Sequence, residues 1–196
     1  MSVKEKNLHC LMKRRPDLYQ LYESGKGDEP QTVLSKSGLP VFRHKSVAFH
    51  SLYKPELEGG RFAENINAET KNVWVYGMGY GYQLSKFLER DVKLTLLEPS
   101  VDIFRSAVEN VDITALIENC DLSVGGDFFK KAVKAELGNA ALTVHRPYLQ
   151  FFGEEFKKLE SAFIVRSYLS KKRLRAMLVG PIYGGSEPTF RYAGAA

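Results

Sequence analysis

The chain has 196 residues, of which 44% are hydrophobic, and it carries a formal net charge of +5. This composition excludes an intrinsically disordered chain, and no apolar run approaches the roughly 20 residues of a membrane span. The length suits one α/β domain of about 150 residues with an appendage. The basic residues lie in separate short clusters that are typical of solvated helix faces, so no nucleic-acid partner is expected.

The cysteines and histidines lack the spacing of a metal site. Cys10 and Cys120 are far apart in the chain, and the four histidines are scattered. No structural metal is therefore predicted. The charged N-terminal segment lacks the apolar centre of a secretory signal, so we expect a cytoplasmic protein with free thiols.

Residues 1–70 are predicted to form an appendage that precedes the main domain. Apolar residues at helical spacing between positions 5 and 23, divided by Pro16, predict two short helices. β-branched residues around Ser37-Gly38 predict a small β-hairpin. A turn and a short helix are expected next, in residues 53–66.

The pattern changes at residue 71, where strands begin to alternate with helices. The expected strands are residues 72–77, 91–99, 121–127 and 139–147. This alternation over residues 71–172 predicts an α/β fold with a doubly wound, mainly parallel, Rossmann-like sheet. The segment RLRAMLVG, residues 173–180, predicts a fifth strand or the truncated start of a following domain within residues 173–196.

The segment VWVYGMGYGYQL predicts a strand, a glycine turn and the start of a helix. Gly77, Gly79 and Gly81 would let the backbone approach a ligand closely, and the helix N-terminus would attract an anion. Glu98 ends the second strand, 21 positions after Gly77, where an acid binds ribose hydroxyls. Asp127 ends the third strand, in a position to accept a hydrogen bond from an adenine amino group. We therefore expect an adenosine-shaped crevice at the carboxyl ends of the strands.

Aromatic and histidine side chains flank this expected crevice. Tyr76, Tyr80 and Tyr82 alternate with the glycines, where they would stack on a base or pack in the core. His145 ends the fourth strand, on the same edge, as a candidate general base or phosphate contact. The alternative interpretation is that His145 is a polar residue at the end of a strand and has no role in binding.

A second interpretation of these residues is purely structural. The glycines would then allow a strand and a helix to pack tightly, while Glu98 and Asp127 would cap helices. The same two interpretations apply to a group that precedes the glycine turn. This group would line a pocket or hold a linker onto the sheet, and it comprises His50, Ser51, Tyr53 and Arg61.

The ordered set of glycines and acids resembles the class I S-adenosylmethionine-dependent methyltransferases. The resemblance implies an S-adenosylmethionine site that contains Gly77, Gly79, Gly81, Glu98 and Asp127. Two departures weaken the case for methyl transfer: Val75 replaces the acid that usually precedes the first glycine by two positions, and HRPYLQFF lacks a methyl-acceptor motif such as NPPY. Binding of an adenosine-like ligand is thus favoured over methyl transfer.

A second resemblance covers more of the chain, from Asn7 to Pro147. NLHCLMKRRPDLYQLYE is similar to the opening of bacterial motility-associated factor (Maf) proteins, and VYGMGYGYQL and LLEPSVDIF resemble their glycine turn and "vEPd" segment. The segment FHSLYKPELEGGRFAE resembles their "LHS-x-Y-D-P … E-A-x-R-F" block, although Lys54 replaces the usual acid. The block is carried here by His50, Ser51, Tyr53, Pro55, Glu56, Arg61 and Phe62.

The Maf resemblance implies an N-terminal domain of a larger bacterial protein. Maf proteins are implicated in glycosylating flagellin with nonulosonic acids, and a later domain is held responsible for transfer from a sugar nucleotide. The tail RLRAMLVGPIYGGSEPTFRYAGAA resembles the first strand and turn of a GT-B glycosyltransferase, with Gly180, Gly184 and Gly185 in the turn and Ser186 as N-cap. On this hypothesis the chain is a fragment cut just inside that domain; the alternative is a natural end at Ala196.

Three hypotheses for function follow. The first is a non-catalytic Rossmann-like domain of a bacterial glycosyltransferase in surface or flagellar glycosylation. It would bind a nucleotide-type ligand, or dock the transferase onto an acceptor protein such as flagellin. The second is a methyltransferase, so that S-adenosylmethionine and a sugar nucleotide are the two candidate cofactors. The third is an interaction domain with an empty pocket.

Overall fold

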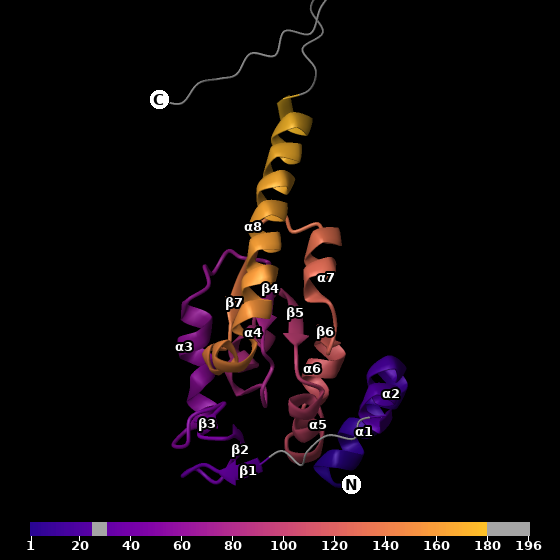
Figure 1. Cartoon of the computed structure of the whole chain (residues 1–196), viewed down its shortest axis with the longest axis vertical. Coiled ribbons are helices and arrows are strands. Elements are labelled where there is room, and N and C mark those ends of the chain that lie inside the picture. Colours follow the sequence, from indigo (N-terminus) through magenta and orange to yellow (C-terminus); the bar gives the residue numbers. More distant parts are fainter. Residues whose placement is uncertain (25–30, 180–196) are drawn as a thin grey trace, which may run out of the picture.

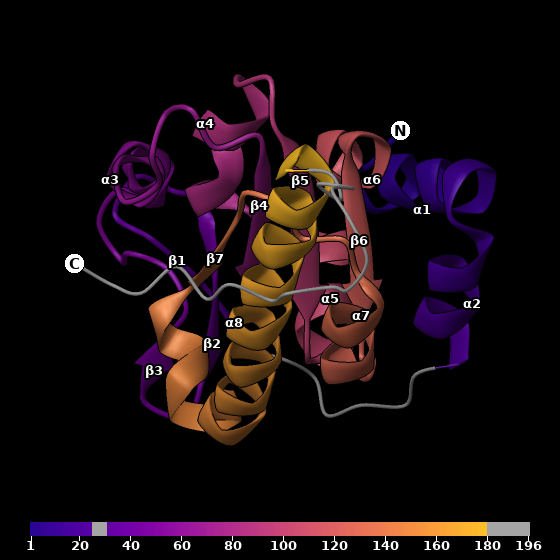
Figure 2. The same ribbon diagram turned by 90° about the horizontal axis from the view of Figure 1, so that it is seen from above.

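The computed structural model describes residues 1–24 and 31–179 of the chain. These residues form a four-stranded parallel sheet with helices on both faces, together with a small three-stranded antiparallel sheet (Figures 1 and 2). The predicted α/β class, the parallel Rossmann-like sheet, the N-terminal helices and the β-hairpin are all confirmed.

The main sheet has the strand order β6-β5-β4-β7, and neighbouring strands are parallel. Its strands are β4 (Asn72–Tyr76), β5 (Lys93–Glu98), β6 (Cys120–Val124) and β7 (Ala140–Val144). The chain runs outward from β4 through β5 to β6 and then returns to the other side of β4 with β7. The point between β4 and β7 is therefore the topological switch point, where open α/β sheets form ligand crevices at the carboxyl ends of their strands.

Strand β4 is apolar on both faces because helices cover both sides of the sheet. Trp74 packs edge-to-face on Phe163, with ring centroids 5.7 Å apart. The ring centroids of Tyr76 and Phe156 are 5.4 Å apart. Both partners belong to helix α8 (Leu149–Val179). The alternate residue Val75 is fully buried on the opposite side. A continuous apolar run is typical of a parallel strand buried between two helical layers.

Helices α7 (Phe128–Lys134) and α8 lie side by side in front of the sheet in Figure 2. Helix α5 (Val101–Asn110) begins at Ser100, whose hydroxyl accepts a hydrogen bond from the Ile103 amide, as expected for an N-cap. The helix expected after the glycine turn is short and consists of η2 (Tyr82–Leu84) and α4 (Ser85–Leu88). Helix α6 (Thr114–Asn119) was not predicted from the sequence.

The N-terminal helices α1 (Val3–Arg14) and α2 (Pro16–Ser24) pack beside α5 and α6. Asn7 is fully buried on this contact. Its side-chain amide donates to the carbonyls of Val108 and Val111 and accepts from the Ile113 amide. One asparagine therefore joins α1 to the connection between α5 and α6.

The small sheet leads the chain toward the carboxyl ends of β4 and β7. Its strands are β1 (Gln31–Leu34), β2 (Pro40–His44) and β3 (Val47–Ala48). Gly38 lies in the turn between β1 and β2 with φ +81°, in the left-handed region that favours glycine. The single turn η1 (Pro55–Leu57) and helix α3 (Glu58–Glu64) follow, and Figure 1 shows α3 beside the main sheet.

The expected fifth strand is wrong, because residues 173–179 continue helix α8. This stretch is rich in leucine, arginine, alanine and methionine, which are strong helix formers, and no glycine or proline interrupts it. Helix α8 extends well beyond the rest of the domain in Figure 1. The glycine turn expected at Gly180, Gly184, Gly185 and Ser186 lies outside the described residues. The boundary at residue 70 and the following domain remain predictions.

Across the two described ranges, the structure holds no helix with both the length and the apolar character that a bilayer crossing requires.

Candidate functional site

The glycine turn after β4 is filled by side chains of the protein itself. Gly77, Gly79 and Gly81 have φ values of +91°, +54° and +82°, all in the left-handed region. A Cβ atom on Gly77 would overlap the ring of Tyr148. On Gly79 it would lie 2.5 Å from Nε2 of His50, and on Gly81 it would lie 2.7 Å from Leu116. The close approach that these glycines permit is therefore made by protein side chains.

Glu98 is fully buried beneath this turn, and its carboxylate accepts several hydrogen bonds. The amides of Met78 and Ser100 donate to it at 2.9 Å each, and the Tyr148 hydroxyl donates to Oε2. The Gly79 amide donates to the Tyr148 oxygen at 2.8 Å. Burial raises the pKa of Glu98 to about 7, against the opposing effect of these hydrogen bonds. Tyr148 thus makes the contact that the sequence assigns to a ribose hydroxyl.

Asp127 lies apart from Glu98, on the surface. Its carboxylate accepts from the Lys130 amide at 3.1 Å and caps α7, in agreement with the structural interpretation of the sequence. The same hydrogen bond holds the pKa of Asp127 below its ordinary value. Asp127 borders a depression of about 340 Å³ with Gly125 and Gly126, and Glu98 does not line it. The two predicted acids therefore do not face one shared cavity, and their ligand contacts remain predictions.

The three tyrosines of the turn are engaged in packing and hydrogen bonds. The Tyr76 hydroxyl donates to Glu155 at 3.3 Å, and the Tyr82 hydroxyl donates to the Pro40 carbonyl at 2.9 Å. The Tyr80 hydroxyl lies within hydrogen-bond distance of Thr32. Each ring ties the glycine turn to another part of the fold.

A cavity of about 650 Å³ opens on the other side of β4, at its junction with β7. One wall comes from the segment after β3 and includes Phe49 and His50. Helix α3 contributes Glu58 and Arg61, and the end of β7 contributes His145. The cavity therefore lies at the topological switch point and has the volume of a small-molecule site.

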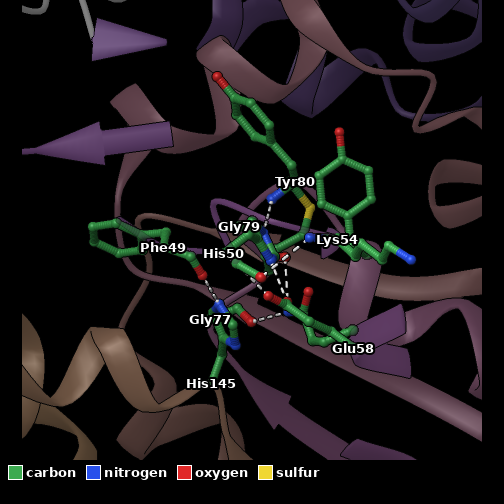
Figure 3. A network of polar contacts seen from close by, with 12 residues as sticks. Phe49, His50, Lys54, Glu58, Gly77, Gly79, Tyr80 and His145 are labelled. Atoms are coloured by element: carbon green, nitrogen blue, oxygen red, sulfur yellow. Dashed lines mark hydrogen bonds and ion pairs between the residues drawn. The ribbon is translucent and has the colours of Figure 1, made fainter. Parts of the chain in front are cut away.

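His50 lines this cavity and also contacts the glycine turn, and Figure 3 shows its contacts with Glu58 and Tyr80. Its Nε2 atom accepts a hydrogen bond of 2.8 Å from the Tyr80 amide, so the ring proton is on Nδ1. That Nδ1–H donates to Oε2 of Glu58 at 2.7 Å, and the Ser51 amide donates to the other oxygen. Burial tends to raise the pKa of Glu58, but the hydrogen bonds from His50 and Ser51 hold it below its ordinary value.

His145 is the second buried histidine, and its ring stacks on His50 with centroids 4.8 Å apart. Its Nε2–H donates to the carbonyl of Phe49 (Figure 3), which leaves a lone pair on Nδ1. Burial lowers the pKa of His145 to about 3, and the nearby His50 adds to this effect. The side chain is therefore a neutral hydrogen-bond acceptor at physiological pH.

His50, Glu58 and His145 bring three potential metal-ligand atoms within 4.8 Å of one another. A metal would need the lone pair of each histidine nitrogen that faces it. On His50 that nitrogen, Nδ1, carries the proton, because Nε2 accepts from the Tyr80 amide. The protonation pattern therefore fits a hydrogen-bonded network better than a metal centre.

No protein-family model matches the chain, and no curated protein matches its sequence. A solved glycosyltransferase shares its fold. That structure is the MAf glycosyltransferase from Magnetospirillum magneticum AMB-1, with a TM-score of 0.55 and 14% sequence identity. The match covers 83% of this chain and 35% of that protein, so the chain spans about a third of the length of the glycosyltransferase.

The shared fold puts the Maf-like sequence block in a structural context. His50, Ser51, Arg61 and Phe62 of that block all line the cavity. The acid that contacts His50 is Glu58, whereas Glu56 accepts a hydrogen bond from Ser37. Sequence reasoning missed Glu58, although its position three residues before Arg61 matches the spacing in the block.

Gln83 and Tyr148 were also missed. Gln83 lies two residues after Gly81, and its side-chain amide donates to the carbonyls of Gly77 and Met78. Tyr148 follows the fourth strand in HRPY, and only the fold brings it onto Gly77. The sequence signal for Tyr148 was its position just after the end of a parallel strand.

Proposed function

We propose that the chain is a non-catalytic domain of a Maf-like bacterial glycosyltransferase, which docks the enzyme onto its acceptor protein in surface or flagellar glycosylation. The shared fold and the Maf-like sequence blocks support this assignment. Transfer from a sugar nucleotide is then the task of another part of the complete protein.

One observation carries the choice of docking over nucleotide binding. The glycine turn, where a nucleotide-type ligand was expected, is filled by Tyr148, His50 and Leu116. The carboxylate of Glu98 is already engaged with backbone amides and with Tyr148. A nucleoside at this turn would have to displace a buried tyrosine and break these hydrogen bonds.

Helix α8 supports an interaction role. Ile164, Val165 and Leu169 of this helix are exposed to 63%, 58% and 47%. Exposed apolar side chains that gather on one element are typical of a surface that contacts another protein.

Calorimetry with adenosine, uridine and S-adenosylhomocysteine tests the closed turn. We expect each of the three to bind with a Kd weaker than about 1 mM, which corresponds to a binding free energy of less than about 4 kcal/mol. Binding of S-adenosylhomocysteine that is lost in Asp127→Ala would contradict the proposal and restore the methyltransferase hypothesis. Asp127 is an exposed helix cap, so this variant is expected to fold.

The docking role is tested on the complete transferase with its acceptor protein. We expect Ile164→Glu to weaken binding to the acceptor protein by about tenfold or more, because a charge replaces an apolar contact. Transfer to a short acceptor peptide should be unchanged. Ser161→Glu introduces the same charge at a polar exposed position of α8 and serves as the matched control. Equal binding by both variants and the unmodified enzyme would refute docking through this helix.

A further inference from the structure

Gln83 lines the cavity between β4 and β7, and its side chain has a buried hydrogen-bond acceptor without a donor in the described chain. Gln83 is fully buried, and its Nε2 donates to the carbonyls of Gly77 and Met78 at 3.2 and 2.9 Å. Because both of these partners are acceptors, the orientation of the side-chain amide is determined. Its Oε1 is buried and finds no partner among the described residues. Leaving such an atom unpaired is unfavourable, so a ligand that donates to it is favoured.

His145 supplies a second acceptor on the same cavity. Its Nε2–H is held by the carbonyl of Phe49, and no hydrogen bond to Nδ1 exists within the described ranges. Glu58, close by, presents a carboxylate that is ionised at neutral pH. Both oxygens of Glu58 already accept hydrogen bonds, from His50 and Ser51. Gln83 Oε1 and His145 Nδ1 are therefore the two acceptors that lack a donor in the described chain, and they call for a ligand that carries hydroxyl groups.

Two basic side chains line the cavity and are exposed to solvent. Arg61 from α3 and Arg146 from η3 (Arg146–Tyr148) are exposed and line the cavity. Neither guanidinium pairs with an acid or a carbonyl within residues 1–24 and 31–170, unlike Arg15, which pairs with Asp17 at 2.8 Å. Two free guanidinium groups match the several oxygens and the double charge of a phosphate monoester.

We propose that this cavity binds a sugar phosphate, with the phosphate at Arg61 and Arg146 and the sugar hydroxyls donating to Gln83 and His145. Phe49 and Phe62 contribute to the apolar part of the wall. The volume of about 650 Å³ is ample for a hexose phosphate. The site goes beyond the docking role because the exposed apolar residues Ile164, Val165 and Leu169 of α8 do not line it.

The test uses titration of the whole chain with glucose 6-phosphate, ribose 5-phosphate, glucose and inorganic phosphate. We expect at least one sugar phosphate to bind about tenfold tighter than glucose and inorganic phosphate, because both halves of the site then contribute. Binding should shift the ¹⁵N resonance of His145 Nδ1, which gains a donor. The double variant Arg61→Gln/Arg146→Gln should weaken binding by about tenfold or more.

A matched control removes the same charge elsewhere. Arg14→Gln/Arg43→Gln changes two exposed arginines that do not line the cavity, and it should leave the affinity unchanged. Three outcomes would overturn the proposal. These are no binding of either sugar phosphate at about 10 mM, equal affinity for inorganic phosphate, and equal weakening by the two double variants. None of them bears on the docking role, which is measured through Ile164→Glu.

Discussion

At the carboxyl end of β4, the side toward β5 is filled with protein, whereas the side toward β7 holds a cavity. On the β5 side, the carboxylate of Glu98 accepts from backbone amides and from Tyr148. On the β7 side, Gln83 Oε1 and two arginines have no such partners in the described chain. Polar groups that are satisfied by the fold contribute stability, while unsatisfied ones at a cavity are available to a ligand.

The two sides are connected by one residue. His50 approaches Gly79 with the Nε2 edge of its ring, lines the cavity, and hydrogen-bonds Glu58 in the cavity wall. The closed side therefore holds the wall of the open side in place. Changes to the closed side should reduce the stability of the whole domain, and changes to the open side should alter binding alone.

Tyr148→Ala is expected to give the largest loss of stability. It removes a fully buried ring that covers Gly77, together with the hydroxyl that joins Glu98 to the Gly79 amide. We expect the free energy of unfolding to fall by about 4 kcal/mol, measured by urea denaturation.

Tyr148→Phe separates the two contributions of that residue. It keeps the ring and removes the hydroxyl, so the free energy of unfolding should fall by about 1–3 kcal/mol. If Tyr148→Ala cost less than Tyr148→Phe, the ring would not be filling the turn as the structure indicates. Nucleoside binding to Tyr148→Ala, but not to the unmodified chain, would identify the ring as the group that blocks the turn.

The pH dependence of stability is the second test of the closed side. A glutamate in the unfolded chain ionises near pH 4.5, whereas Glu98 ionises near pH 7 in the fold. The folded protein thus binds this proton more tightly, and Glu98 stabilises the fold below about pH 4.5. That contribution, of about 3 kcal/mol, should be lost as the pH rises to about 7.

The comparison with Glu98→Gln isolates this effect. His145, with its lowered pKa, has the opposite influence between about pH 3 and 6.5, and it acts equally in both proteins. The difference in unfolding free energy between the unmodified chain and Glu98→Gln should therefore decrease from pH 4.5 to 7. A difference that is constant with pH would mean that Glu98 keeps its ordinary pKa in the fold.

The contrast between the two sides also shows what the sequence could reveal. The strands and the N-cap at Ser100 follow from local patterns, because an apolar run and a serine before a helix act within a few residues. The packing of Tyr148 into the glycine turn does not follow from a local pattern, since Tyr148 is 69 positions from Gly79. No periodicity indicates which distant side chain will cover a glycine.

Two secondary-structure errors have local causes. Helix α6 has only six residues, too few for a helical period to stand out. The segment after residue 172 contains a short apolar run, and such a run fits a strand and a buried helix equally well. The glycine pattern correctly predicts a turn, but the same pattern allows close approach either by a ligand or by a side chain of the protein.

Alanine substitutions in the glycines separate backbone strain from lack of space. Gly77→Ala and Gly38→Ala both place a side chain at a left-handed residue, with φ +91° and +81°. At Gly38 the added atom meets nothing within 4 Å, whereas at Gly77 it overlaps Tyr148. We expect Gly38→Ala to lower the free energy of unfolding by about 1 kcal/mol, and Gly77→Ala to lower it by about 2 kcal/mol more. Equal losses in thermal denaturation would show that the turn has room.

Removal of the arginines at the cavity should have the smallest effect on stability. Arg61→Gln and Arg146→Gln each eliminate an exposed guanidinium that stabilises no acid of the described chain, so unfolding free energies should change by less than about 0.5 kcal/mol. Arg15→Gln breaks the contact with Asp17 and serves as the reference for a paired surface arginine, with a loss of up to about 1 kcal/mol. A loss of 2 kcal/mol at Arg61 or Arg146 would mean that these side chains stabilise the fold. The open side would then be a structural feature like the closed one, and weaker sugar phosphate binding by the double variant would have a trivial cause.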